Sequence, residues 1–167
     1  MKVKLKKLTI FNSLFLYKFF KNIPYNENGS INYASGRTFR SYKNWVEENL
    51  KRSNFKHEVN GFVPQTIYIL YINNKPVGVS KIRPLMNENT LEWGGNIGYN
   101  IIKEYRGLGY GNIILKESLS ICEDIGLDKV LLTIKKRNEA SMKIAFKNGA
   151  ILEKEVDGNC YLWINLT

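Results

Sequence analysis

A glycine-rich segment between two regular patterns constrains the fold of this chain more than any other feature. Ile97, Tyr99 and Ile101 recur at the period of a strand. Residues 106–111, Arg-Gly-Leu-Gly-Tyr-Gly, then remove side chains where the chain must turn, and an amphipathic pattern begins directly after them. The segment therefore predicts a strand, a glycine loop and a helix in immediate succession.

This arrangement is typical of an anion-binding site. Glycines let backbone N–H groups approach a ligand closely, and the unpaired N–H groups at the start of a helix favour a phosphate there. A glycine-rich turn that binds nothing has the same sequence, so the loop alone leaves that alternative open.

Composition agrees with a globular protein that has an anionic partner. The chain has 167 residues, of which 44% are hydrophobic, and this length fits one domain with a substantial core. The formal net charge of +10 suits a phosphorylated cofactor, a nucleic acid or an acidic surface, but it does not choose among them.

Other residue types exclude several classes of protein. Cys122 and Cys160 fall on predicted buried faces, so we expect reduced core thiols rather than a disulfide framework. His57 has no nearby cysteine or acidic cluster, and no metal site is predicted. The apolar run at 14–20 is too short and too interrupted by lysine to span a bilayer, and no cleavage site follows it. We expect a cytoplasmic protein without membrane contact.

The first half of the chain predicts one strand, two helices and a hairpin. Residues 3–10 read as a strand, and Ser13 caps a helix that Pro24 stops. A turn-rich loop at 26–30 precedes a helix from about Thr38 to Arg52, whose apolar side chains recur at helical spacing. The runs 66–72 and 77–82 flank a tight turn and predict a hairpin.

The second half predicts a strand–helix–strand unit and a closing hairpin. We expect an extended segment over 91–102 with a bend at Gly94-Gly95, a helix that ends at Gly126, and a strand at 129–134 parallel to the one before the loop. A helix capped by Asn138 and a hairpin through Asp157-Gly158 follow. These elements predict one α+β domain with a mixed sheet.

Two ordered motifs resemble the GNAT superfamily of acyl-coenzyme A dependent N-acetyltransferases. Its main signature is arginine or glutamine, two residues, glycine, one residue, then glycine or alanine, and Arg106, Gly109 and Gly111 fill it. The second match is Asn138-Glu-Ala-Ser141 followed by Phe146-Lys-Asn-Gly149. Two further stretches, Gly95-Asn-Ile-Gly-Tyr99 and Asn148-Gly-Ala-Ile-Leu-Glu-Lys-Glu155, are similar to a bacterial subgroup of predicted acetyltransferases.

The resemblance implies a fold and a domain plan. It implies a single GNAT-like domain over 1–167, with a mixed central sheet of about six to seven strands, helices on both faces, and two strands that splay apart at the cofactor. Residues 1–59 would form the acceptor wall, with aromatic residues of 14–45 contributing, and residues 60–167 the cofactor-binding core.

The resemblance also assigns acetyl-CoA as the acyl donor and co-substrate, with no metal. The strand at Tyr99, Asn100 and Ile101 would pair with the pantetheine amides, and Asn138 and Ser141 would flank the arm from the other side. The alternatives are that Asn138 is a simple helix cap and that Ser141 is only a polar residue of the first helical turn. The pyrophosphate would lie on the loop and first helical turn, formed by Arg106, Gly107, Leu108, Gly109, Tyr110, Gly111 and Asn112.

The mechanism implied by the resemblance is attack of a neutral amine on the thioester carbonyl, with a backbone N–H near Ile101 stabilising the oxyanion. Glu92 is the most suggestive general base, and an exposed strand or loop carboxylate without a catalytic role is the alternative. Many relatives use a tyrosine as the general acid where this chain has Phe146, so Tyr99 or Tyr110 serves instead, or the thiolate leaves without an acid.

The acceptor is an unidentified amine, and a homodimer is a further expectation. The competing class is a non-catalytic GNAT-fold protein that binds RNA or another anionic partner, although no nucleic-acid signature accompanies the charge. A nucleotide-hydrolysing P-loop is excluded because no Gly-Lys-Ser/Thr follows the glycines.

Overall fold

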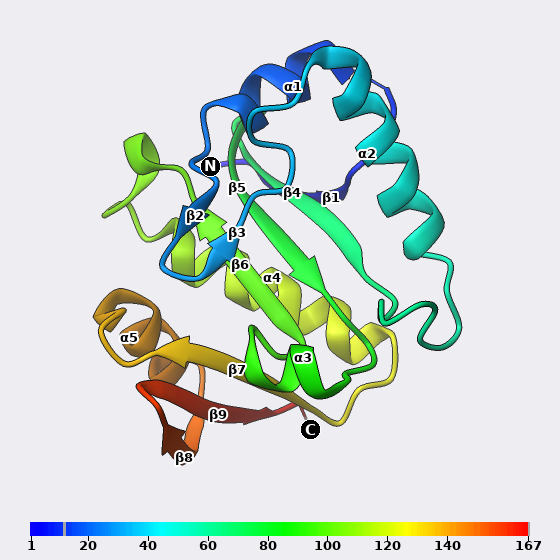
Figure 1. Cartoon of the computed structure of the whole chain (residues 1–167). Coiled ribbons are helices and arrows are strands. Elements are labelled where there is room, and N and C mark those ends of the chain that lie inside the picture. The colour runs from blue at the N-terminus through cyan, green and yellow to red at the C-terminus, as the bar shows by residue number, and fades with distance from the viewer. Residues whose placement is uncertain (12, 167) are drawn as a thin grey trace.

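A computed structural model describes residues 1–11 and 13–166 (Figure 1). The helices are α1 (Ser13–Lys21), α2 (Phe39–Arg52), α3 (Glu88–Glu92), the short 3₁₀ helix η1 (Lys103–Tyr105), α4 (Tyr110–Asp124) and α5 (Glu139–Lys147). The strands are β1 (Val3–Lys7), β2 (Asn26–Glu27), β3 (Ser30–Ile31), β4 (Thr66–Ile72), β5 (Lys75–Ile82), β6 (Ile97–Ile101), β7 (Lys129–Lys135), β8 (Ile151–Val156) and β9 (Asn159–Asn165).

The larger sheet has the antiparallel order β1-β4-β5-β6. β4 and β5 are joined at Asn73 and Asn74, both with positive φ, which matches the predicted tight turn. Because alternate side chains of a strand face opposite sides, each strand contributes to two separate cores. The helices therefore cover both faces of this sheet.

One face packs on α1 and α2 and the other on α4. Ile67, Ile69 and Val79 bury against the aromatic side chains of the two N-terminal helices, including Tyr42 and Trp45. Tyr42 and Trp45 of α2 are thus core residues, as their spacing predicts, whereas Phe39 at the start of the helix is exposed. On the opposite face, α4 packs against β5 and β6.

The smaller sheet, of order β7-β9-β8, is also antiparallel and is covered by α5. It meets the larger sheet at one point, where Asn96 N donates to Leu131 O at 2.8 Å and Leu131 N donates to Asn96 Oδ1 at 2.8 Å. No ladder joins β6 and β7 within residues 1–11 and 13–166. The parallel pairing expected from the strand–helix–strand unit is therefore confined to this contact.

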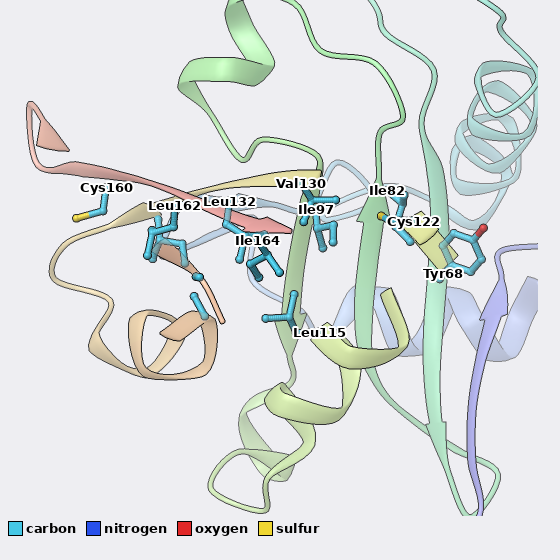
Figure 2. Close-up of a cluster of buried hydrophobic side chains, with 13 residues drawn as sticks. Tyr68, Ile82, Ile97, Leu115, Cys122, Val130, Leu132, Cys160, Leu162 and Ile164 are labelled. Carbon is cyan, nitrogen blue, oxygen red and sulfur yellow. The ribbon is translucent and has the colours of Figure 1, made fainter. Parts of the chain in front are cut away.

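A continuous hydrophobic core nevertheless holds the two sheets together (Figure 2). Ile82 and Ile97 from the larger sheet and Leu132 and Leu162 from the smaller one surround Leu115 of α4. Burial of such side chains contributes roughly 1.5–3 kcal/mol each, so the core rather than backbone pairing fixes the sheets. Cys122 and Cys160 are free thiols in this core, as expected. The α+β fold with splayed strands is confirmed.

Two expectations for local structure were wrong. The extended segment predicted over 91–102 is interrupted, because Asn87 caps α3 through a reciprocal pair of bonds with Thr90, so the strand starts only at Ile97. The loop at 26–30 is a hairpin, since Asn28 and Gly29 both adopt positive φ and form its turn. Across the described residues, no helix is long and apolar enough to cross a membrane.

Candidate cofactor and active site

The outer edge of β6 has no neighbouring strand among the described residues. Ile102 N donates to Val77 O at 3.0 Å, so Ile102 faces β5, and so does Asn100 two residues earlier. Because the backbone direction alternates along an antiparallel pair, Tyr99 and Ile101 turn their N–H groups to the opposite side. That side faces β7 across the gap between the sheets.

β7 presents a similar edge. Lys136 N donates to Gly158 O at 2.9 Å, and the same alternation turns the backbone of Thr133 away from β9 and toward β6. From the Asn96–Leu131 contact the two strands diverge toward their C-terminal ends (Figure 1). The gap between them is therefore bordered on both sides by backbone hydrogen-bonding groups.

Gly95 allows the two sheets to approach each other where Asn96 contacts the backbone of Leu131. Its φ is +64°, and an added Cβ would lie 2.2 Å from the carbonyl oxygen of Leu131. No side chain fits this space, and L-residues rarely adopt this conformation. The bend predicted at Gly94-Gly95 is thus the point from which β6 and β7 splay.

The start of α4 lies at the end of β6 and has no side-chain cap. Its N-cap is Gly109, and its first turn carries no acidic residue. By contrast, Thr38 caps α2 and Asn138 caps α5. The backbone N–H groups of Tyr110 and Gly111 consequently lack intrahelical partners, and the helix dipole adds a partial positive charge there.

The loop before α4 needs glycine because its backbone adopts positive φ, and not because neighbouring atoms would exclude a side chain. Gly107 and Gly109 have φ of +74° and +81°, and an added Cβ at either would meet no atom within 4 Å. Leu108 between them is exposed. The predicted donor Asn112 is already engaged, because its N–H donates to Gly109 O and its Oδ1 accepts from Asn148 Nδ2 at 2.9 Å.

Arg106 uses its side chain to fasten this loop. Its Nη1 donates to Glu27 Oε1 at 2.9 Å, its Nη2 to Glu27 Oε2, and its Nε to the carbonyl oxygen of Ile101 at 2.8 Å. Nη2 also approaches Asn100 Oδ1 at 3.3 Å. Arg106 and Asn100 thus support the site through their side chains, and the Arg106 guanidinium lowers the pKa of the Glu27 carboxyl.

The β2–β3 hairpin carries Glu27 and extends across β6 (Figure 1). The tip of this hairpin lies close to Lys135 at the end of β7. A Cβ atom added to Gly29 at the tip would lie 3.4 Å from the Lys135 side chain. Lys135 also lies 5.8 Å from the ring centroid of Trp93, which follows α3. The hairpin and α3 therefore border the gap on the side of the sheet that faces away from α4.

Tyr99 extends on the α4 side of β6. Its hydroxyl oxygen is buried, and none of the described residues hydrogen-bonds to it. Burial raises the pKa of Tyr99, and the nearby Ser141 hydroxyl of α5 opposes the shift. Asn138 Oδ1 accepts from Ser141 N at 3.3 Å, so the predicted helix cap is present. Tyr99, Asn138 and Ser141 thus lie together beside the gap.

Glu92 lies elsewhere than expected. It is the exposed last residue of α3 rather than part of a strand, and it lines a shallow depression with Lys154, Asp157 and Tyr161 of the β8–β9 hairpin. Phe146 is an exposed residue of α5. The structure therefore places Tyr99 in the strand that borders the gap, and the carboxylate of Glu92 beside another hairpin.

Comparison with known proteins identifies the family. Residues 25–151 match the model of the Acetyltransferase (GNAT) domain, which is more than half of the chain, and the chain therefore belongs to the GNAT acetyltransferase family. These proteins are acetyl-CoA-dependent N-acetyltransferases, so the predicted enzyme class and acyl donor are confirmed. A comparison with curated protein sequences finds no match.

Solved structures share the fold along almost the whole chain. RimL, a ribosomal alpha-N-protein acetyltransferase in complex with coenzyme A, has 14% identity and a TM-score of 0.74, with 99% of this chain and 94% of that chain covered. The N-acetyltransferase PseH from Campylobacter jejuni has 16% identity and a TM-score of 0.68, with 99% of each chain covered. A dodecameric spermidine N-acetyltransferase from Vibrio cholerae has 12% identity and a TM-score of 0.67, with 98% and 94% covered.

Two residues of the site were missed by sequence reasoning. Glu27 stands in a turn-rich segment, 79 positions from Arg106, and no local pattern indicates its partner. The hairpin that carries it has a usable signal, because Asn28-Gly29 is a common two-residue turn. The other is Gly95. The sequence predicts a bend at this residue but not its close approach to Leu131.

Proposed function

We propose that the protein transfers the acetyl group of acetyl-CoA to a primary amine by direct attack of the neutral amine on the thioester carbonyl. A C–N bond forms in a tetrahedral intermediate, the C–S bond then breaks, and the amine loses a proton. The observation that carries the proposal is the pair of diverging strand edges that leads to the uncapped start of α4.

The backbone supports binding of an extended amide-containing arm. An added strand binds through main-chain hydrogen bonds, and the outward N–H and C=O groups of Tyr99 offer such bonds to pantetheine. The free N–H groups of Tyr110 and Gly111 suit the pyrophosphate. Asn138 and Ser141 flank the arm from α5.

The same edge supports the chemistry. The N–H of Ile101 stabilises the developing oxyanion, a contribution of about 3 kcal/mol for one well-placed donor. Tyr99 is the proposed general acid for the leaving thiolate, because it belongs to the strand that borders the gap and its buried hydroxyl has no partner among the described residues. Glu92 remains the proposed base, and a water molecule has to connect it to the amine. An unchanged pH–rate profile in Glu92→Gln would remove it from that role.

The binding proposal is tested by calorimetric titration with acetyl-CoA in two matched glycine variants. Gly109 and Gly126 lie just outside opposite ends of α4, with φ of +81° and +84°, and both have open space for a Cβ. Alanine at either position strains the backbone to a similar extent, about 1–2 kcal/mol. Only Gly109→Ala is expected to weaken acetyl-CoA binding, by about tenfold if one phosphate hydrogen bond is lost.

Turnover is tested by release of free thiol across a panel of primary amines. No detectable binding at millimolar acetyl-CoA in the unsubstituted protein would overturn the proposal. Steeply salt-dependent RNA binding without coenzyme A affinity would instead favour the non-catalytic alternative. Equal loss of binding in Gly109→Ala and Gly126→Ala would remove the start of α4 as the phosphate site.

In the proposed function, the two parts of the single domain have the separate roles expected for them. Residues 60–167 supply the strand edges and the loop for the acyl donor, and residues 1–59 supply the hairpin that borders the acceptor side. Size-exclusion chromatography with light scattering tests the expected homodimer, which stays a prediction. The cytoplasmic location also stays a prediction.

A further inference from the structure

Three cations gather on the face of the larger sheet that is turned away from α4. Lys81 and Arg83 alternate along and just beyond β5 on the same side as Val79, and Arg52 ends α2 above them. The ion pairs among the described residues are Arg106–Glu27 and Lys136–Glu155, and neither involves this group. We call Arg52, Lys81 and Arg83 the cation cluster.

Some hydrogen-bond donors of Arg83 have no acceptor among the described residues. Its Nε donates to Gln65 Oε1 at 2.9 Å and its Nη1 to the carbonyl oxygen of Gly95 at 3.1 Å. Among the described residues its Nη2 has no acceptor, yet it is not sealed from solvent. Gly94 and Gly98 border the guanidinium, and Cβ atoms there would be in ordinary van der Waals contact with Nη1, at 3.4 and 3.7 Å.

Lys81 and Arg52 are held only by neutral groups. Lys81 Nζ donates to the carbonyl oxygen of Ile31 and lies 5.7 Å from the ring centroid of Tyr33. Arg52 Nε donates to the carbonyl oxygen of Val63 at 2.7 Å, and no acceptor for its other nitrogens occurs in the described part of the chain. The half-buried side chains of the cluster thus retain several unused N–H donors.

The cluster is electrostatically unfavourable as it stands. Burial, with the charges of Arg83 and Arg52, lowers the pKa of Lys81 to about 7. Burial and the charge of Arg52 lower the pKa of Arg83 to about 10. Charges in the interior of a protein are normally paired, because desolvation is costly. An anion among these three groups would restore the missing partner.

The position of the cluster relates it to the gap. Lys81 pairs with Gly98 in the β5–β6 ladder, and Ile101 lies three residues further along β6. At roughly 3.3 Å per residue, the cluster is about 10 Å along the strand from the proposed oxyanion donor. Trp93 and the β2–β3 hairpin border the space on this side.

We infer that Arg52, Lys81 and Arg83 bind an anionic group of the acceptor, so that the substrate is an amine that also carries a carboxylate or phosphate several bonds from its reacting nitrogen. The inference rests on the proposed function, because it places the reacting nitrogen at the gap. Guanidinium forks bind both oxyanions through paired hydrogen bonds, so the shared chemistry is a compact oxyanion.

Sulfate binding tests the cluster without any turnover. Sodium sulfate should raise the melting temperature of the unsubstituted protein in a saturable manner, against sodium chloride at equal ionic strength. Lys81→Met and Arg52→Met should abolish the saturable part. Lys75→Met, which removes an exposed charge from the same strand, should retain it. The same sulfate response in all variants would overturn the inference.

Matched amine pairs test the acceptor class. We expect at least tenfold higher kcat/KM for 6-aminohexanoate than for hexylamine, or for 4-aminobutyl phosphate than for butylamine, and the preferred pair distinguishes carboxylate from phosphate. Lys81→Met should lose the preference, whereas Lys81→Arg and Lys75→Met should keep it. Equal turnover of charged and uncharged amines would overturn the inference and leave the proposed function intact.

The remaining outcomes are also separable. Absence of acetyl-CoA binding defeats the proposed function, and the sulfate measurement still decides whether the cluster binds an anion. If Lys81→Met slows charged and uncharged amines equally and shifts the pH–rate profile, Lys81 acts on the reacting amine itself. That result would overturn the assignment of Lys81 to the anion.

Discussion

Arg106 of the glycine loop binds both carboxylate oxygens of Glu27, a residue 79 positions earlier in the chain. The same guanidinium donates from Nε to the carbonyl oxygen of Ile101 at 2.8 Å. One side chain therefore connects the β2–β3 hairpin, the outer edge of β6 and the loop that leads into α4. Changes at Glu27 are expected to reach the cofactor although Glu27 lies outside the glycine motif.

Glu27→Gln should weaken acetyl-CoA binding with little effect on overall stability. The pair is partly exposed, with relative side-chain exposures of 39% for Arg106 and 24% for Glu27, so its contribution to unfolding free energy is below about 1 kcal/mol. We expect a rise in Kd of roughly threefold and faster hydrogen exchange at residues 26–31. Glu155→Gln, which breaks the other ion pair, is the control.

Acid should loosen the same hairpin in the unsubstituted protein. The Arg106 guanidinium lowers the pKa of Glu27 in the folded state, so the ion pair is fully formed above the ordinary carboxyl pKa. Its contribution is lost as the pH falls through the lowered folded-state pKa. Hydrogen exchange at residues 26–31, corrected for intrinsic pH dependence, should show this loss, and Glu27→Gln should not. Identical pH responses of both proteins would contradict the prediction.

Gly95→Ala should damage the junction of the two sheets. The new Cβ would lie 2.2 Å from the carbonyl oxygen of Leu131, and φ of +64° strains an alanine by about 1–3 kcal/mol before any clash. We expect a loss of unfolding free energy above this range in chemical denaturation. Gly158→Ala, with positive φ but open space, should lose only the strain. Equal losses in both variants would mean that the close contact is unimportant.

Tyr99→Phe should stabilise the unliganded protein and slow turnover. The buried hydroxyl has no partner among the described residues, and removing an unsatisfied polar group relieves roughly 1 kcal/mol. Loss of a general acid lowers kcat by about 100-fold or more. Thermal unfolding and steady-state kinetics measure the two effects separately. Tyr110→Phe is the matched variant, and a larger kcat loss there would transfer the acid role to Tyr110.

Sulfate affinity should fall as the pH rises above about 7, because burial and the charges of Arg83 and Arg52 lower the pKa of Lys81 to about 7. The protonated amine binds the anion, so Kd is constant below this pKa and rises up to tenfold per pH unit above it. The ring of Tyr33 also faces Lys81. Calorimetry from pH 6 to 9 measures the profile, and Lys81→Arg should flatten it. A flat profile in the unsubstituted protein would contradict the prediction.

Local patterns predicted the elements that carry the donor site. The hydrophobic period and the glycines located β6, the loop and α4, and Asn138 and Gly126 marked helix ends. Such signals work because they depend on backbone conformation within a few residues. The capping pair Asn87 and Thr90 is an equally local signal, and it indicates the start of α3.

The contacts of the proposed acceptor side could not be predicted in the same way. Glu27 reaches Arg106, and Arg52 joins Lys81, only after the chain has folded back across the sheet. Each of these residues has an ordinary surface pattern in its own segment. Their proposed roles depend on electrostatic contacts between residues that are far apart in the chain. A single sequence does not show which distant residues come into contact.

The single Asn96–Leu131 contact leaves a strand edge open inside the molecule. Open edges invite pairing with other extended chains, and proteins usually protect them. In the proposed function the acyl donor takes the place of the missing strand, so we expect bound coenzyme A to protect this edge from self-association. Preparations stripped of coenzyme A should consequently aggregate sooner than loaded ones, independently of whether any amine is acetylated.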